Sequence, residues 1–128
     1  MIRVLHIMPS LGYGGITSVV LNYYNQMDKE NVVFDFITHS SAEDFHSDLI
    51  MNNSKIHYFK SLGKLGFREY YYQLKSLLDL GEYDIVHIHM SHITGIFAFF
   101  VYRCGIKNII SHAHTAKLPK NKHFIFWL

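Results

Sequence analysis

The chain has 128 residues, which suffices for one domain and is too short for two. Hydrophobic residues make up 49% of it and charged residues only 17%, a composition that indicates a globular protein with a sizeable core. The formal net charge of +2 is too small to favour nucleic-acid binding, and a single cysteine, Cys104, excludes an internal disulfide.

The N-terminus has no signal-peptide layout, and the longest apolar run is far shorter than the ~20 residues that span a bilayer. The lone cysteine also fits a reducing compartment. We therefore expect a cytoplasmic protein without a membrane span.

The chain begins with a strand, a glycine loop and a helix. Ile2–Ile7 is an apolar run that predicts a buried strand of a parallel sheet. Gly12, Gly14 and Gly15 interrupt it, and apolar residues recur at helical spacing over Ile16–Met27. This order points backbone N–H groups and the positive end of the helix at one spot, which suits a phosphate. The alternative is that the glycines only permit a tight turn and close packing.

Two named phosphate-binding motifs are incomplete in this loop. The dinucleotide fingerprint requires glycine where the chain has Thr17. The P-loop requires a lysine, and none lies between Arg3 and Lys29. The loop therefore predicts an anion site of a less specific kind.

Strands and helices continue to alternate along the chain. We expect strands at Val32–Thr38, Lys55–Phe59, Asp84–His89 and Asn108–His112, and helices at Glu43–Met51, Phe67–Leu80, Ser91–Cys104 and Asn121–Leu128, with a loop at Ser61–Gly66. Such alternation indicates right-handed βαβ units and a parallel sheet. The predicted class is α/β, a doubly wound, Rossmann-like sheet with strand order 3-2-1-4-5 in one domain over residues 1–128.

In this strand order, ligands bind beyond the carboxyl ends of the first and fourth strands. The loop after the fifth strand opens on the same edge. The stretches that converge there are Gly12–Gly15, His89–His92 and His112–Thr115. From them, His89, Ser91 and Thr115 are the candidates for lining a binding cleft.

Two strand ends carry a His-x-His pair, His87 with His89 and His112 with His114. Residues two apart share a face of a strand, and imidazole is a normal zinc ligand, so a metal-dependent hydrolase is an alternative function. No Asp or Glu follows these strands to complete such a site, so we predict no metal and no cofactor. His6, His87 and His112 are interpreted as structural, whereas His89 and His114 end their strands facing the crevice.

Four basic residues, Lys60, Lys64, Arg68 and Lys75, surround the long predicted helix between aromatic residues. We interpret them as a solvated face above a core stripe. The alternative is contact with anionic lipid headgroups.

Together these motifs resemble the N-terminal half of family 4 glycosyltransferases of the GT-B fold, in the branch that builds bacterial capsules and exopolysaccharides. The resemblance rests on IRVLHI and GGITSVVLNYY, on YDIVHIH and on IKNIISHAHT, and it covers essentially all 128 residues. It implies retaining transfer of a sugar from a nucleotide diphosphate sugar to a glycan or lipid-linked acceptor, without a metal. It also implies that this half mainly binds the acceptor, usually a glycolipid at the inner membrane face.

The resemblance assigns roles to individual residues. It places Gly14 and Gly15 in the loop that approaches the donor diphosphate, and His114 beside the transferred sugar as the catalytic residue. Many members have Ala-Glu after the paired glycines, whereas this chain has Ile16 and Thr17, which removes any contact made by that acid.

The family's C-terminal half, which carries the nucleotide pocket, has no counterpart in the 128 residues. We therefore expect the chain alone to be inactive, to need that missing domain or a partner subunit, and to self-associate through exposed apolar surface. A non-catalytic binding module that kept the fold is the second alternative function.

Overall fold

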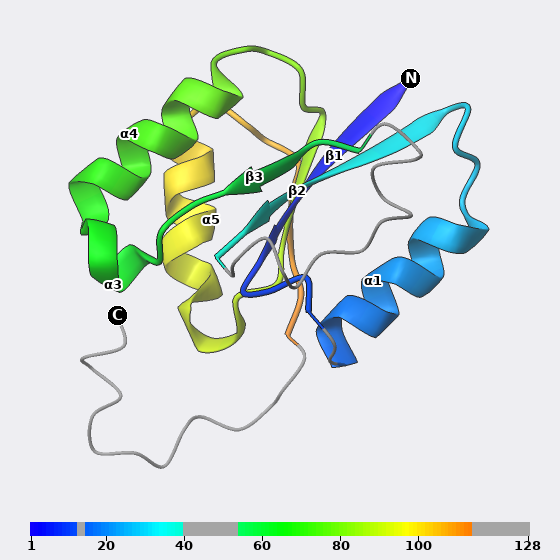
Figure 1. Cartoon of the computed structure of the whole chain (residues 1–128). Coiled ribbons are helices and arrows are strands. Elements are labelled where there is room, and N and C mark those ends of the chain that lie inside the picture. Colours follow the sequence, from blue (N-terminus) through cyan, green and yellow to red (C-terminus); the bar gives the residue numbers. More distant parts are fainter. Residues whose placement is uncertain (13–14, 40–53, 114–128) are drawn as a thin grey trace.

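The computed structural model describes residues 1–12, 15–39 and 54–113, which form one open parallel sheet flanked by helices (Figure 1). The strand order is β3-β2-β1-β4-β5, and every neighbouring pair is parallel. The strands are β1 (Ile2–Met8), β2 (Val32–Thr38), β3 (Ile56–Tyr58), β4 (Ile85–Ile88) and β5 (Ile109–Ser111). The predicted class and strand order are confirmed, with the first strand at the centre.

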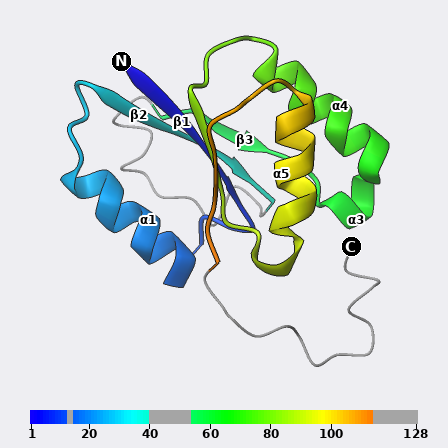
Figure 2. The same ribbon diagram turned by 180° about the vertical axis from the view of Figure 1, so that it is seen from behind.

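Helices cover both faces of this sheet, as a doubly wound fold requires. They are α1 (Gly15–Gln26), α3 (Leu62–Leu65), α4 (Phe67–Leu78) and α5 (Thr94–Arg103), with a 3-10 turn η2 (Ser91–Ile93) before α5. Figures 1 and 2 show α1 on one face and α4 and α5 on the other. The predicted helices Glu43–Met51 and Asn121–Leu128 lie outside the described residues.

The face that carries α4 and α5 holds the larger core. On α4, Tyr70, Leu74 and Leu78 are buried because they recur at a spacing of four residues. They pack in one cluster with alternate residues of the central strands, such as Leu5 and Val86. The helix ends at Leu78, two residues before the predicted end, and the chain then turns at Gly81, whose φ of 73° lies in the left-handed region that favours glycine.

The face that carries α1 holds a smaller core. Val20 and Tyr24 of α1 pack with Met8, Leu11 and Phe36. The two clusters use opposite sides of the same strands, because successive side chains of a strand alternate between faces. A strand that is buried on both faces needs apolar residues at successive positions, which explains the continuous apolar run in β1.

The segment Ser61–Gly66 differs from the predicted loop, since most of it forms the short helix α3. The carbonyl of Ser61 accepts hydrogen bonds from the amides of Lys64 and Leu65, and buried Leu62 anchors the turn in the larger core. One helical turn is too short to show periodicity in a sequence. No helix in the described part of the chain is long and apolar enough to cross a bilayer.

Candidate functional site at the carboxyl edge of the sheet

The loop between β1 and α1 opens on the carboxyl edge of the sheet. The hydroxyl of Ser10 accepts a hydrogen bond from the amide of Gly12 at 2.8 Å. The backbone carbonyl of Ser10 accepts a second one from the hydroxyl of Thr17 at 3.2 Å. These bonds tie the loop to the first turn of α1, which begins at Gly15. A Cβ atom added to Gly15 would meet no heavy atom within 4 Å among the described residues. Packing among the described residues therefore does not require glycine at this position.

A hollow of about 540 Å³ lies at the same edge. It is lined by Pro9, His39, Ser61, Leu62, Gly63, Lys64, Met90, Ile93 and Phe97. Pro9, His39 and Met90 each follow the end of a strand (β1, β2 and β4), so the hollow lies where open parallel sheets bind ligands. Its volume falls within the range of small-molecule sites. Apolar side chains dominate the lining, and Lys64 supplies one cation.

The predicted cleft residues are only partly described. Ser91 follows Met90 of the hollow, is half-buried and has a φ of 53°. A positive φ in a residue other than glycine costs energy and concentrates at functional sites. Gly14, His114 and Thr115 lie outside the described residues, so their assignments stay predictions.

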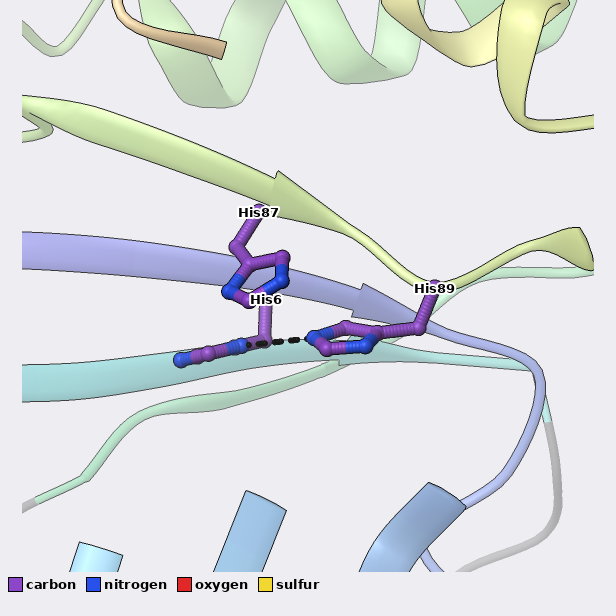
Figure 3. A group of neighbouring side chains, drawn as sticks. All are labelled: His6, His87 and His89. Carbon is purple, nitrogen blue, oxygen red and sulfur yellow. Dashed lines mark hydrogen bonds between the residues drawn. The ribbon is translucent and has the colours of Figure 1, made fainter. Parts of the chain in front are cut away.

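His89 does not line this hollow. Its side chain is only 1% exposed, and its Nε2 lies 3.0 Å from Nδ1 of His6. His87 lies beside both rings, and Figure 3 shows the three side chains converging from β1 and from β4 and its end. His6 and His87 are register partners on neighbouring strands, which puts them on the same face. The role of His89 in acceptor binding stays a prediction.

The histidine cluster differs in membership from the two predicted His-x-His pairs. His6, interpreted from the sequence as a structural residue, joins His87 and His89, and Nδ1 of His112 lies 3.3 Å from Nε2 of His87. A catalytic zinc needs an open position for water and substrate, but His6 and His89 are buried. This burial disfavours the alternative of a metal-dependent hydrolase.

His39 connects the hollow to the core. Its Nδ1–H donates to the carbonyl of Met8 at 2.8 Å, which leaves Nε2 to accept from the hydroxyl of Tyr70 at 2.6 Å. Burial lowers the pKa of His39, and the bond to Met8 opposes that shift only in part. His39 is therefore a neutral ring held in one tautomer at the wall of the hollow.

These lowered pKa values predict a stability that depends on pH. Burial, and next the neighbouring His89 and His87, lower the pKa of His6 well below its ordinary value, and His39 shifts in the same direction. In the unfolded chain both rings take up a proton near pH 6.5. The free energy of unfolding therefore has its full value above about pH 6.5. Below that pH it falls by about 1.4 kcal/mol per pH unit for each ring that stays neutral in the folded chain.

Urea unfolding between pH 7.5 and pH 5.5, in the presence of a chelator, measures this slope. We expect His39→Gln to reduce the slope relative to the unmodified chain. A free energy of unfolding that is constant over this range would contradict the prediction.

Three of the four basic residues predicted to form one face lie in different surroundings. Lys64 lines the hollow, while Nζ of Lys75 pairs with Asp79 at 2.7 Å. Arg68 lies beside the Tyr72 ring and lines a separate aromatic groove between α4 and α5.

Fold and site together define an α/β protein of the Rossmann-like kind, with a candidate ligand site at the carboxyl edge of its sheet. No protein-family model matches the chain. Two curated proteins are similar to it over most of its length. The putative glycosyltransferase EpsF of Bacillus subtilis (strain 168) is 27% identical over 115 residues, which cover 88% of this chain and 30% of that protein.

The second relative is the capsular polysaccharide biosynthesis glycosyltransferase CapH of Staphylococcus aureus. It is 23% identical over 123 residues, which cover 96% of this chain and 34% of that protein. A crystal structure of a glycosyltransferase from Rickettsia africae matches the fold with a TM-score of 0.70 at 13% identity, over 93% of this chain and 31% of that one.

These similarities confirm the resemblance to glycosyltransferases that the sequence motifs predict. The chain spans about a third of the length of the curated relatives it matches.

Proposed function

We propose that this chain is the acceptor-side part of a glycosyltransferase that acts in cell-surface polysaccharide synthesis. In the proposed reaction, a sugar moves from a nucleotide diphosphate sugar to a glycan or lipid-linked acceptor with retention at the anomeric carbon, without a metal or cofactor in the chemistry. The observation that carries the proposal is the match of two glycosyltransferases to nearly the whole chain. The shared fold and the hollow at the carboxyl edge support it.

We assign the acceptor to the hollow beside α3. Its apolar walls, such as Ile93 and Phe97, suit the non-polar faces of a sugar ring or a lipid portion, and Lys64 suits an anionic group such as a phosphate. The strained backbone at Ser91 lies next to this lining. Ser91 is proposed to position the acceptor, with Thr115 on the same edge.

The donor approaches from the neighbouring loop. Gly15 at the start of α1 leaves room for a diphosphate, and the helix end favours its negative charge. The nucleotide pocket is proposed to lie in a C-terminal domain of the GT-B kind or in a partner subunit, because the chain spans only about a third of its relatives. The chain alone is then inactive and self-associates through the apolar surface that this partner covers.

Peripheral membrane contact is part of the same proposal. An aromatic groove between α4 and α5 is lined by Phe67, Arg68, Tyr71, Phe99, Phe100 and Arg103. Phe67 and Phe99 are more than half exposed, and arginines flank them. Aromatic side chains beside cations suit the interface of an anionic leaflet, which supports the proposed contact with the inner face of the membrane.

Obstruction of the hollow tests the proposed acceptor site. Ser61 lines the hollow, and its side chain makes no capping hydrogen bond to α3, so Ser61→Phe adds bulk at small structural cost. In the chain completed with its donor-binding part, we expect Ser61→Phe to raise the acceptor KM by at least about 10-fold, equivalent to a loss of about 1.4 kcal/mol of binding. The KM for the donor should change little.

Ser76→Phe is the matched control, since Ser76 is exposed on α4 away from the hollow. An equal rise of acceptor KM in both variants, or no rise in Ser61→Phe, would place the acceptor elsewhere.

A further inference from the structure

The histidines of β1 and β4 form a cluster that the proposed sugar transfer does not use. One ring nitrogen from each of His6, His87 and His89 lies within 4.8 Å of the other two (Figure 3). We propose that these three imidazoles bind one divalent cation of the zinc type, which has a structural role and ties β1 to β4. The inference is independent of the proposed function.

The chemistry of the ligand set selects the class of cation. Among the described residues, this group contains no carboxylate and no thiol. Calcium and magnesium require oxygen ligands, whereas neutral imidazole suits zinc, copper and nickel. The burial of His6 and its two histidine neighbours keep that ring neutral, and the neutral ring is the form that coordinates a metal.

Two nitrogens already lie at nearly the spacing that a cation needs. Nδ1 of His6 and Nε2 of His89 are 3.0 Å apart, compared with about 3.3 Å for two nitrogens bound to one tetrahedral zinc. They share one hydrogen in the cation-free chain. In the tautomer in which Nδ1 of His6 carries that hydrogen, cation binding moves it to Nε2 of His6, a buried atom with no hydrogen-bond partner in the described structure, so no bond is lost at that atom. The exchange of tautomers releases no net proton.

The third ligand, His87, is less buried than the other two and has a hydrogen-bond partner in His112. His87 is half-buried, and its ring stacks on that of His89 with centroids 4.1 Å apart. Its Nε2 lies 3.3 Å from Nδ1 of His112, which is the kind of outer hydrogen bond that orients metal-bound imidazoles.

The surroundings of the cluster indicate a structural cation. The rings of Phe34 and Phe36 lie 4.2 Å and 5.4 Å from that of His6, on the face that carries α1. Such apolar walls keep a substrate away from the cation, and the binding free energy of a cation held there adds to the stability of the fold.

Titration of the chain, produced without a polyhistidine tag, tests the proposal. We expect Co²⁺ to bind with a stoichiometry of one and to give the intense visible absorption of a four-coordinate site, and Zn²⁺ to displace it and raise the Tm. His87→Gln should weaken binding by at least about 100-fold, because loss of even an outer-shell partner costs 10–100-fold. His57→Gln, a half-buried histidine on β3 outside the cluster, is the matched control and should bind like the unmodified chain.

X-ray absorption at the zinc edge reports the ligands of the bound ion in the unmodified chain, without any variant. We expect it to show three imidazole ligands. Absence of saturable binding, fewer than three imidazoles at the zinc, or equal weakening in His87→Gln and His57→Gln would overturn the proposal.

Discussion

Replacement of His114 by alanine, in the chain completed with its donor-binding part, is expected to lower kcat by about 10²–10⁴-fold, the range for a positioned catalytic group. His114 lies three residues beyond the end of β5 and outside the described residues, so its assignment rests on the resemblance. In a retaining transfer, positive charge develops on the sugar ring while the diphosphate leaves. A neutral imidazole can orient a sugar hydroxyl or face this charge, and the leaving phosphate can take the acceptor proton.

Two measurements separate this role from a purely structural one. Single-turnover rate and Tm are compared for His114→Ala and for His92→Ala, an exposed histidine of η2 that serves as the matched control. A destabilised His114→Ala with an unchanged rate would defeat the catalytic assignment. His89→Ala should lower the Tm because His89 is buried.

Asp35→Ala is expected to lower the free energy of unfolding by about 3 kcal/mol, the scale for breaking a buried ion pair. The side chain of Asp35 is fully buried in β2. Its carboxylate lies 2.7 Å from the guanidinium of Arg3, accepts from the hydroxyl of Tyr83 at 2.8 Å and accepts from the amide of Lys55 at 2.9 Å. Removal of Asp35 leaves these donors without their acceptor.

Urea unfolding measures this loss, with Asp79→Ala as the control. Asp79 pairs with Lys75 on the exposed side of α4, where solvent screens the charges, and little change is expected. Equal stability of the Asp35→Ala variant and the unmodified chain would contradict the structural role of the buried carboxylate.

The elements that the sequence predicts best are those with long, regular patterns. The predicted strand Val32–Thr38 coincides with β2, and the predicted helix Phe67–Leu80 extends α4 by two residues. Buried apolar runs and helical spacing are local features, so a single sequence contains them. The helix α3 could not be predicted in this way, because a single helical turn is stabilised by the burial of Leu62 against residues distant in the sequence.

The site was less predictable because it depends on residues far apart in the chain. The predicted strand order identifies the carboxyl edge of the sheet as the ligand-binding edge. Gly15, His89 and Ser91 follow from it as candidate residues. The hollow beside α3 combines His39 with Lys64 and could not be read from either segment alone. The contact of His6 with His89 depends on strand register, which the sequence does not encode locally.

Transfer of a radiolabelled sugar is the most direct test of the proposed glycosyltransferase function. The 128-residue chain is assayed alone and fused to the remaining two thirds of the Bacillus subtilis relative, in place of the segment that it matches. With a panel of nucleotide diphosphate sugars and membrane acceptors, we expect transfer by the fusion, none by the chain alone, and strong impairment of the fusion by Ser61→Phe. Transfer by the chain alone, or a fusion that folds and binds the nucleotide yet glycosylates no acceptor, would contradict the proposed function.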